Sequence, residues 1–241
     1  MINSISVILP LYNEAKRLNK SFFEIKKFIK KNKIRSKEFI FVDDGSNDNS
    51  AQMVNNFINR NKKLKNSKLK LIKLSRNQGK GAALKKGVEK ARSKWILTSD
   101  IDFSVSLFEL GRWEKQKYIR NTKPVYFGSR SHSASVVNSK LYRKIIGKFL
   151  RFLISFILGI SLQDTQCGFK LYKKILAKKI FSQLKFLGYE HDIEIVVLLK
   201  KLNIKIVELP VRWSHVKLSK VNLISDSLTI FFKIFLMKIK Y

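Results

Sequence analysis

Short hydrophobic runs alternate with helix-like stretches along the first hundred residues, and this alternation constrains the fold most. The runs are rich in β-branched and aromatic side chains and lie at residues 4–9, 38–42, 69–74 and 95–98. Helical periodicity fills the intervals at about 14–32, 48–63 and 80–92. Buried runs separated by helices are typical of parallel strands joined by right-handed crossovers. We therefore expect an α/β fold with a Rossmann-like, mostly parallel sheet flanked by helices.

The second half of the chain continues the pattern less regularly. We expect a helix near 105–118, a strand at 125–129, a long helical stretch at about 138–160, a loop at 161–168, two further helices and a strand at 205–209. The sequence contains no internal repeat and no low-complexity linker. We therefore expect both halves to share one sheet in a catalytic domain of residues 1–214, followed by an extension at 215–241.

Carboxylates follow three of the strand-like runs directly. They are Glu14, Asp43, Asp44, Asp100 and Asp102. In an open α/β sheet the ligand crevice lies outside the carboxyl ends of the strands, so these acidic tips should meet in one place. One use for such a cluster is to hold a divalent cation together with the hydroxyls of a nucleotide.

The pair Asp100 and Asp102 is the strongest candidate for a metal site. Two carboxylates at positions i and i+2 of a loop can turn toward one hard cation, and Mg²⁺ or Mn²⁺ prefers oxygen ligands. An Asp-x-Asp pair also occurs often without a metal, and its position after a buried strand is what favours the metal here. His132, His191 and His215 lack the spacing of a zinc site.

Two glycine-containing segments allow two interpretations each. Residues 77–81 (Asn-Gln-Gly-Lys-Gly) precede a helix, so their backbone amides could face a phosphate, although a tight turn explains them as well. Residues 43–46 (Asp-Asp-Gly-Ser) are also ordinary turn chemistry after a strand.

The chain is strongly basic, with 50 lysines and arginines against 17 acidic residues and a net charge of +33. An anionic membrane or phosphorylated ligands would suit this charge, and drift in base composition would also produce it. We expect no nucleic-acid partner, because basic and aromatic residues do not alternate as in a stacking platform. The single cysteine, Cys167, excludes an intramolecular disulfide, and nothing in residues 1–9 resembles a signal peptide, so we expect a cytosolic environment.

Two apolar segments suggest contact with a membrane surface. The run at 149–160 is too short to cross a bilayer, and the tail at 221–241 mixes apolar residues with Asp226 and several lysines. We expect the tail to form an amphipathic helix that lies on an anionic bilayer. Packing of this helix against the catalytic domain is the alternative.

At this point the sequence resembles a known family. Six motifs follow one another as in family 2 glycosyltransferases of the GT-A fold, with the polyprenyl-phosphate transferases, and among them the dolichyl-phosphate β-glucosyltransferases, as the nearest branch. The motifs occupy residues 10–14, 42–46, 77–82, 100–102, 128–130 and 164–170, and the resemblance extends from about residue 4 to 214.

The resemblance implies a role for each matched residue. Binding of the nucleotide sugar falls to Pro10, Tyr12, Asn13, Glu14, Asp43, Asp44, Lys80 and Asp100. Metal binding falls to Asp100 and Asp102, with Mg²⁺ or Mn²⁺ as the cofactor. Asp164 and Arg130 would be catalytic, and Arg143 and Lys170 would face the acceptor phosphate. Asp164 could instead cap its loop through an Asx-turn, and Arg130 could be a surface arginine. One departure is Ser104, which stands where mannosyltransferase relatives often carry a glutamine near the metal.

The resemblance also implies an activity. We expect an inverting transfer of glucose from UDP-glucose to a polyprenyl phosphate, at the cytoplasmic face of a membrane to which the protein is peripheral. The alternatives are a GDP-mannose-dependent polyprenyl-phosphate mannosyltransferase, a soluble family 2 transferase that acts on a sugar hydroxyl, and a binding module without turnover. A hydroxyl acceptor needs a carboxylate base, whereas a lipid phosphate is already an anion near neutral pH.

Overall fold

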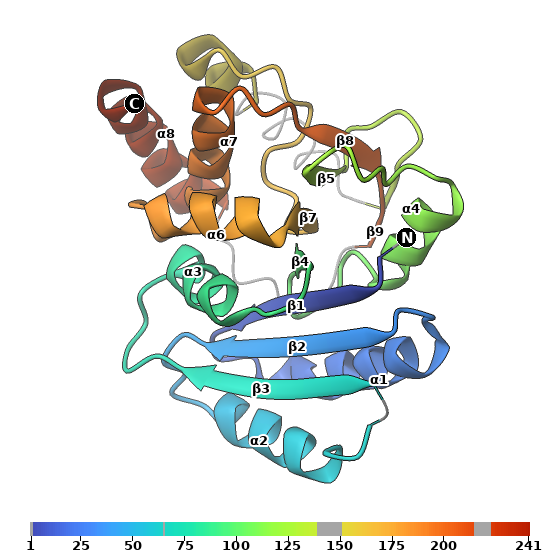
Figure 1. Ribbon diagram of the computed structural model, residues 1–241. Helices are drawn as coiled ribbons and strands as arrows, with labels where there is room; N and C mark the ends of the chain where they lie inside the picture. Colours follow the sequence, from blue (N-terminus) through green and yellow to red (C-terminus); the bar gives the residue numbers. More distant parts are fainter. Residues whose placement is uncertain (1, 65, 139–150, 215–222) are drawn as a thin grey trace.

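A computed structural model describes residues 2–64, 66–138, 151–214 and 223–241, without the side chains of 223–231. In the described part of the chain, seven strands form one sheet in the order β3-β2-β1-β4-β7-β5-β8 (Figure 1). Their bounds are Ser4–Leu11 (β1), Ser36–Asp43 (β2), Ser67–Lys73 (β3), Trp95–Thr98 (β4), Val125–Ser129 (β5), Lys170–Lys173 (β7) and Val207–Pro210 (β8). The expectation that both halves share a sheet is confirmed.

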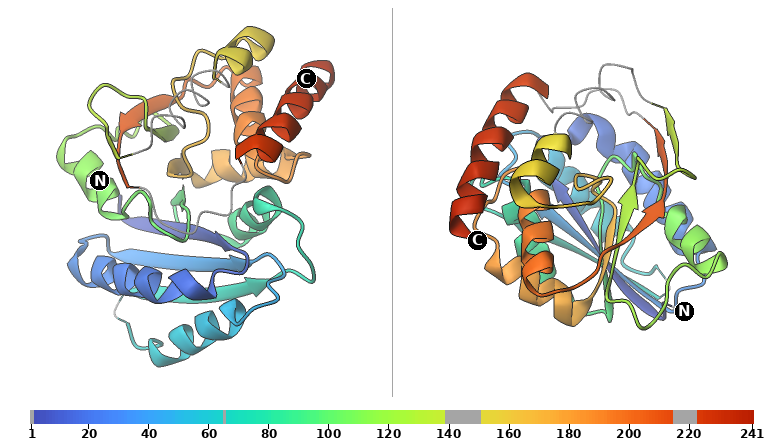
Figure 2. Two further views of the ribbon diagram at one scale, coloured as in Figure 1. Left: turned by 180° about the vertical axis from the view of Figure 1, so that it is seen from behind. Right: turned by 90° about the horizontal axis from the view of Figure 1, so that it is seen from above.

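Helices cover both faces of this sheet (Figure 2). They are Ala15–Lys31 (α1), Ser50–Arg60 (α2), Lys80–Lys90 (α3), Phe108–Lys115 (α4), Lys174–Gln183 (α6), His191–Lys201 (α7), Leu223–Lys240 (α8) and a helix at 151–158. One hydrophobic cluster joins α1, α2 and α4 to one face, and a second joins α3, α6, α7 and α8 to the other. The expected α/β class with a mostly parallel sheet is confirmed.

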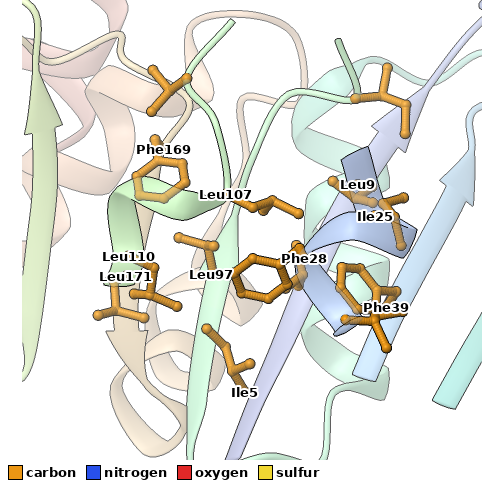
Figure 3. Packing of buried hydrophobic residues seen from close by; sticks show 14 of the residues in the cluster. Ile5, Leu9, Ile25, Phe28, Phe39, Leu97, Leu107, Leu110, Phe169 and Leu171 are labelled. Carbon is orange, nitrogen blue, oxygen red and sulfur yellow. The ribbon is translucent and has the colours of Figure 1, made fainter. Parts of the chain in front are cut away.

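Helix α1 illustrates how the sequence pattern becomes packing. Its buried side chains recur every three or four residues and are Leu18, Ser21, Phe22, Ile25, Phe28 and Ile29. This spacing places them on one stripe of the helix, which faces the sheet. Figure 3 shows Ile25 and Phe28 of α1 against strand residues such as Leu9 and Phe39. Phe28 meets Phe39 edge to face with a ring-centroid distance of 6.3 Å.

The strand β7 was not expected from the sequence. It is antiparallel to both β4 and β5, whereas the other pairings within this sheet are parallel. Its four residues, Lys-Leu-Tyr-Lys, carry lysines at both ends and therefore lack the hydrophobic signature of a buried strand. Two short strands, Val136–Asn138 (β6) and Arg212–Ser214 (β9), were also not expected, and they pair parallel in a second sheet.

The helical stretch expected at 138–160 is only partly testable. Residues 151–158 are helical, and residues 139–150 lie outside the described part of the chain. The described helix buries Ile154 and Ile157 and exposes Phe152 and Phe156, whose rings stack with centroids 6.2 Å apart. One face of this short helix therefore packs into the protein, and the opposite face presents aromatic rings to its surroundings.

The C-terminal helix α8 is present, and it packs on the domain. Ile234 and Met237 are fully buried in the cluster that also holds α7 and the 151–158 helix. Lys233 pairs with Glu190 at 2.5 Å, and the hydroxyl of Tyr241 donates to Glu194 at 2.5 Å. The packing alternative is therefore correct for one face of α8. Another face leaves apolar side chains exposed at Phe232, Phe235, Leu236 and Ile239.

Candidate active site

The strand order places a topological switch between β1 and β4. Strands β2 and β3 extend the sheet on one side of β1 and β4 extends it on the other, so the topology switches direction at this point. Ligands of open α/β sheets bind at such a switch, beyond the carboxyl ends of the strands. The segments after β1, β2 and β4 carry the acidic residues singled out from the sequence, and the structure brings them together there.

The segment after β1 is fastened to the segment after β2. Asn13 adopts a positive φ of 52°, a region that asparagine tolerates better than most residues. Its side-chain oxygen accepts the amides of Asn47 and Asp48 at 2.8 and 3.3 Å, and its own amide donates to the Ser46 hydroxyl at 2.8 Å. Pro10 is buried at the end of β1 and Tyr12 is partly exposed next to Asn13. This segment is therefore rigidly placed at the crevice.

The two aspartates after β2 have different surroundings. Asp43 is buried and accepts the amide of Ser46 at 3.3 Å and also its hydroxyl. Asp44 accepts the amides of Gln78 and Gly79 at 2.9 and 2.8 Å. Burial, together with the nearby charge of Asp43, raises the pKa of Asp44 despite these hydrogen bonds. In this structure Asp44 therefore anchors the glycine loop.

The glycine loop at residues 77–81 is a tight turn, and several backbone amides in and next to it donate to acceptors inside the protein. Besides the two amides bound by Asp44, those of Gly81 and Ala82 share the carbonyl of Leu187 at 2.7 and 3.3 Å. These four amides therefore do not face a phosphate in this structure, because they already have internal acceptors. Gly79 has a φ of 101°, and a β-carbon there would lie 2.4 Å from the Leu187 oxygen, so only glycine fits.

Lys80 leaves this loop and reaches the acid that follows β4. Its ammonium lies 2.5 Å from Asp100, and the pair is partly open, with side-chain exposures of 22% and 36%. Burial alone would lower the pKa of Lys80, but the carboxylates of Asp100 and Asp192 raise it above its ordinary value. Gly168 lies directly against Asp100, since a β-carbon at Gly168 would come within 2.6 Å of a carboxylate oxygen.

Asp102 is held by the first turn of α1. The guanidinium of Arg17 lies 3.2 Å from one oxygen of Asp102, and the amide of Ser104 donates to the other at 3.0 Å. Arg17 also makes a two-pronged ion pair with Glu14, at 2.6 and 2.5 Å. Burial and the neighbouring charge of Asp100 raise the pKa of Asp102. Sequence reasoning missed Arg17, although its position three residues after Glu14 on a helix was a usable signal.

The donor set of Asp100 and Asp102 fits a hard divalent cation. Both groups supply carboxylate oxygens, and each already attracts a cationic side chain of the protein itself. Within the described residues, no group of three or more histidine, cysteine, aspartate or glutamate side chains is placed to hold a metal. Mg²⁺ and Mn²⁺ suit such a site, since they commonly take one or two carboxylates and complete their shell with water and substrate phosphate.

A narrow cleft of about 30 Å³ separates Asp100 from Arg130 and is also lined by Gln166, Gly168 and Trp213. Arg130 makes a two-pronged ion pair with Asp164 at 2.7 and 2.9 Å, and its amide donates to the same carboxylate at 2.9 Å. Burial alone would raise the pKa of Asp164, but Arg130 lowers it below its ordinary value. About a third of the Arg130 side chain remains exposed, whereas Asp164 is buried.

The two residues expected at an acceptor phosphate are not placed there by the described structure. Lys170 is buried, with its ammonium paired to Asp192 and donating to the carbonyl of Thr165 at 2.9 Å. It therefore does not line the cleft and has a structural environment, which corrects the expectation from the sequence. Arg143 lies outside the described residues.

Two further acids, Glu190 and Glu194, lie at the start of α7 and hold the turn that contacts the glycine loop. Glu194 accepts the amides of Lys185 and Phe186, and Glu190 accepts the amide of Gly188 at 3.2 Å. None of these contacts is a side-chain cap of α7 itself. The cluster positions residues 185–188, whose Leu187 carbonyl binds the glycine loop.

Comparisons with known proteins identify the family of the chain. The model of the glycosyl transferase family 2 matches residues 6–181. The dolichyl-phosphate beta-glucosyltransferase of Dictyostelium discoideum is 35% identical over 233 residues, which cover 93% of this chain and 70% of that protein. The Saccharomyces cerevisiae protein of the same name is 33% identical over 237 residues, with 93% and 71% covered.

Solved structures support the fold. Glucosyl-3-phosphoglycerate synthase from Mycobacterium tuberculosis, in complex with Mn²⁺ and UDP-glucose, superimposes with a TM-score of 0.69 at 14% identity and covers 98% of this chain and 79% of its own. Mannosyl-3-phosphoglycerate synthase from Rubrobacter xylanophilus gives 0.64 at 16%, with 99% and 73% covered. The expected GT-A fold is confirmed. From the family match, the close relatives and the fold together, this chain belongs to the family 2 glycosyltransferases and is a glycosyltransferase.

Proposed function

We propose that this glycosyltransferase moves glucose from UDP-glucose to a polyprenyl phosphate with inversion at the anomeric carbon. The observation that carries the proposal is the state of Asp164. Both of its oxygens are held by Arg130, and Arg130 lowers its pKa. A carboxylate in this state is a weak base toward an alcohol, which needs its proton removed to react. A phosphate acceptor has a second pKa near 6 and needs positioning more than deprotonation.

The residues around the crevice divide the work of binding the donor. Pro10, Tyr12, Asn13 and Glu14, together with Asp43, border the place for the base and ribose. Asp100 and Asp102 would hold the metal ion, which when bound supplies positive charge to the departing diphosphate. Lys80 and the exposed part of Arg130 flank the same space and would contribute further positive charge there.

The donor and acceptor assignments rest on relatives. The curated relatives named above are dolichyl-phosphate beta-glucosyltransferases, and their names give both the sugar and the lipid. A structural neighbour was solved with Mn²⁺ and UDP-glucose, which supports the metal and the nucleotide. These assignments therefore extend to this chain as proposals.

Exposed apolar side chains supply a route to the lipid. Phe152 and Phe156 of the 151–158 helix, and Phe232, Leu236 and Ile239 of α8, point away from the core that both helices share. Ile239 and Phe156 are 85% and 79% exposed. None of the described helices is both long and apolar enough to cross a bilayer. We propose that this surface rests on the cytoplasmic face of an anionic membrane, with the basic charge of the chain favouring contact.

The first experiment separates the acceptor classes. Purified protein is incubated with radiolabelled UDP-glucose or GDP-mannose and either polyprenyl phosphate or the matching polyprenol. We expect glucosylation of the phosphate alone, and only from UDP-glucose. If the alcohol is the better acceptor and Asp164→Asn abolishes its reaction, a hydroxyl-directed transferase with Asp164 as base takes the place of this proposal. A preference for GDP-mannose would identify a mannosyltransferase.

The second experiment tests the membrane surface without removing α8, because deletion would also uncover the core around Ile234 and Met237. Phe156→Ser and Phe232→Ser should each weaken sedimentation with anionic liposomes. Phe23→Ser on α1 is the matched control, since Phe23 is also mostly exposed, at 61%, on a different helix. Liposome binding by the two test variants at the level of the control would exclude this surface.

A further inference from the structure

Arg17 joins two parts of the site that the sequence motifs treat separately. It lies in the first turn of α1 and is mostly buried, with 13% of its side chain exposed. Through Nε and Nη2 it grips both oxygens of Glu14, at 2.6 and 2.5 Å. Through Nη1 it reaches Asp102 at 3.2 Å. One guanidinium therefore connects the base- and ribose-binding segment to an expected metal ligand.

The same helix also holds the backbone beside Asp102. The hydroxyl of Ser21, one turn after Arg17, donates to the carbonyl of Ile101 at 2.6 Å. Asp102 consequently has a partner on each oxygen, namely Ser104 on Oδ1 and Arg17 on Oδ2. A metal ion at Asp102 either displaces Arg17 from Oδ2 or binds while Arg17 still pairs with the same carboxylate. In either case the guanidinium opposes a second positive charge nearby.

The charges of the neighbouring side chains indicate what would offset the repulsion between Arg17 and the metal ion. Glu14, Asp100 and Asp102 are compensated by Arg17 and Lys80, so a divalent cation alone would leave the cluster with excess positive charge. The diphosphate of a nucleotide would restore the balance and offer Arg17 and Lys80 new anionic neighbours. Metal and nucleotide should therefore bind better together than either binds alone.

We propose that Arg17 is a positioning residue that makes metal binding depend on the nucleotide. Arg17 pairs with Asp102 when the donor is absent, and this ion pair weakens when a diphosphate binds. This inference rests on the metal site of the proposed function, and not on the identity of the sugar or the acceptor.

The test measures Mn²⁺ binding directly, from the electron paramagnetic resonance signal of free Mn²⁺, with and without UDP. For the parent we expect weak binding of Mn²⁺ alone and a clear gain on adding UDP. Arg17→Gln should bind Mn²⁺ alone about tenfold more tightly and show a correspondingly smaller gain from UDP, because one opposing charge is gone. Arg17→Lys keeps the charge and should retain most of the gain.

Arg60→Gln is the matched control, since Arg60 is an exposed arginine on α2, and it should behave as the parent. Circular dichroism establishes that each variant is folded, and Arg17→Met, which also removes the charge, carries the test if the glutamine variant is not folded. Equal Mn²⁺ affinities and equal UDP gains in Arg17→Gln and the parent would overturn the inference, as would a parent that binds no Mn²⁺ under either condition. A parent that shows the UDP gain but glucosylates no lipid would overturn the acceptor assignment and support the role of Arg17.

Discussion

Two lysine–aspartate pairs mark two regions of the protein with different tasks. Lys80 and Asp100 meet at the ends of the parallel strands, where 22% and 36% of their side chains are exposed. Lys170 and Asp192 meet at the start of the antiparallel strand β7, where the exposures are 1% and 9%. The first pair can exchange its partner for a ligand because water and solutes reach it. The second is sealed, so no ligand can replace its partners, although the charge of Asp192 also helps to raise the pKa of Lys80.

The chemistry around each pair reinforces the difference. The ammonium of Lys170 also donates to the Thr165 carbonyl and lies 4.7 Å from the centre of the Phe127 ring. Burial alone would raise the pKa of Asp192, but the neighbouring His191, Lys170 and Lys80 lower it to about 2. The same residue types therefore serve binding at the open strand ends and serve stability in the interior.

The largest effect should come from the open region. Asp102→Asn removes one carboxylate from the expected metal site while the amide oxygen can still accept from Ser104, so the fold should persist. We expect turnover to fall about 1000-fold, or about 4 kcal/mol in activation free energy. Glu89→Gln, an exposed acid on α3, is the control and should keep parental activity. Near-parental turnover by a folded Asp102→Asn protein would remove the metal assignment.

Substitutions in the buried pair should lower the free energy of unfolding. Lys170→Met leaves Asp192 charged in the interior, and we expect a loss of about 3 kcal/mol or more in the free energy of unfolding, measured with urea. The double variant Lys170→Met/Asp192→Leu removes both charges and should lose less than the sum of the two single variants. Additive losses, or a single variant within about 1 kcal/mol of the parent, would show that the pair does not stabilise the interior as described.

We expect the corresponding substitution in the open pair to affect ligand binding more than stability. Lys80→Met should cost less than about 1 kcal/mol of stability, because partly exposed pairs contribute little. It should weaken UDP binding in the presence of Mn²⁺ by about tenfold, since a cation beside the diphosphate is lost. Calorimetric titration with UDP measures this change. A destabilisation as large as that of Lys170→Met would erase the distinction between the two regions.

The smallest effect concerns His191, next to Asp192. Burial lowers the pKa of His191 below its ordinary value, whereas a histidine in the unfolded chain has a pKa of about 6.5. Below that pH the unfolded chain takes up the proton more readily than the folded protein. The stability from keeping His191 neutral is therefore present above roughly pH 6.5 and is lost as the pH falls through that value toward the folded pKa.

The loss between pH 7.5 and 5.5 should amount to about 1.4 kcal/mol at most. His191→Asn retains a donor for the carbonyl of Gly188 and should flatten this part of the stability curve. The control is His132→Asn, in the loop between β5 and β6. If the parent and His191→Asn lose stability equally over this range, burial of His191 does not govern the acid limb.

The sequence was informative wherever a local signal coincided with a local structure. Short apolar runs predict strands β1, β2 and β4. The acids that follow these runs lie at strand ends because the chain turns there. Asp100 and Asp102 could be singled out for this reason. Strand β7 could not, because Lys170 looks like a surface residue until a partner such as Asp192, 22 positions away, is known.

The assignments that the structure revised all depended on long-range partners. Amides of the glycine loop had two interpretations in the sequence, and the carbonyl of Leu187 together with Asp44 decided for the turn. The tail also had two interpretations, and burial of Ile234 decided that one face packs while the exposed Ile239 keeps the membrane proposal open to test.

The sequence by itself determined the α/β class, the order of the first elements and the gathering of acidic residues at one edge of the sheet. Hydrophobic periodicity encodes these features within windows of ten to twenty residues. Only the tertiary structure decided which charges are free to bind and which are already satisfied, as with Arg17 on Asp102 and Arg130 on Asp164. Pairing of charges depends on distances between residues remote in the chain, and burial then fixes whether a ligand can replace the partner.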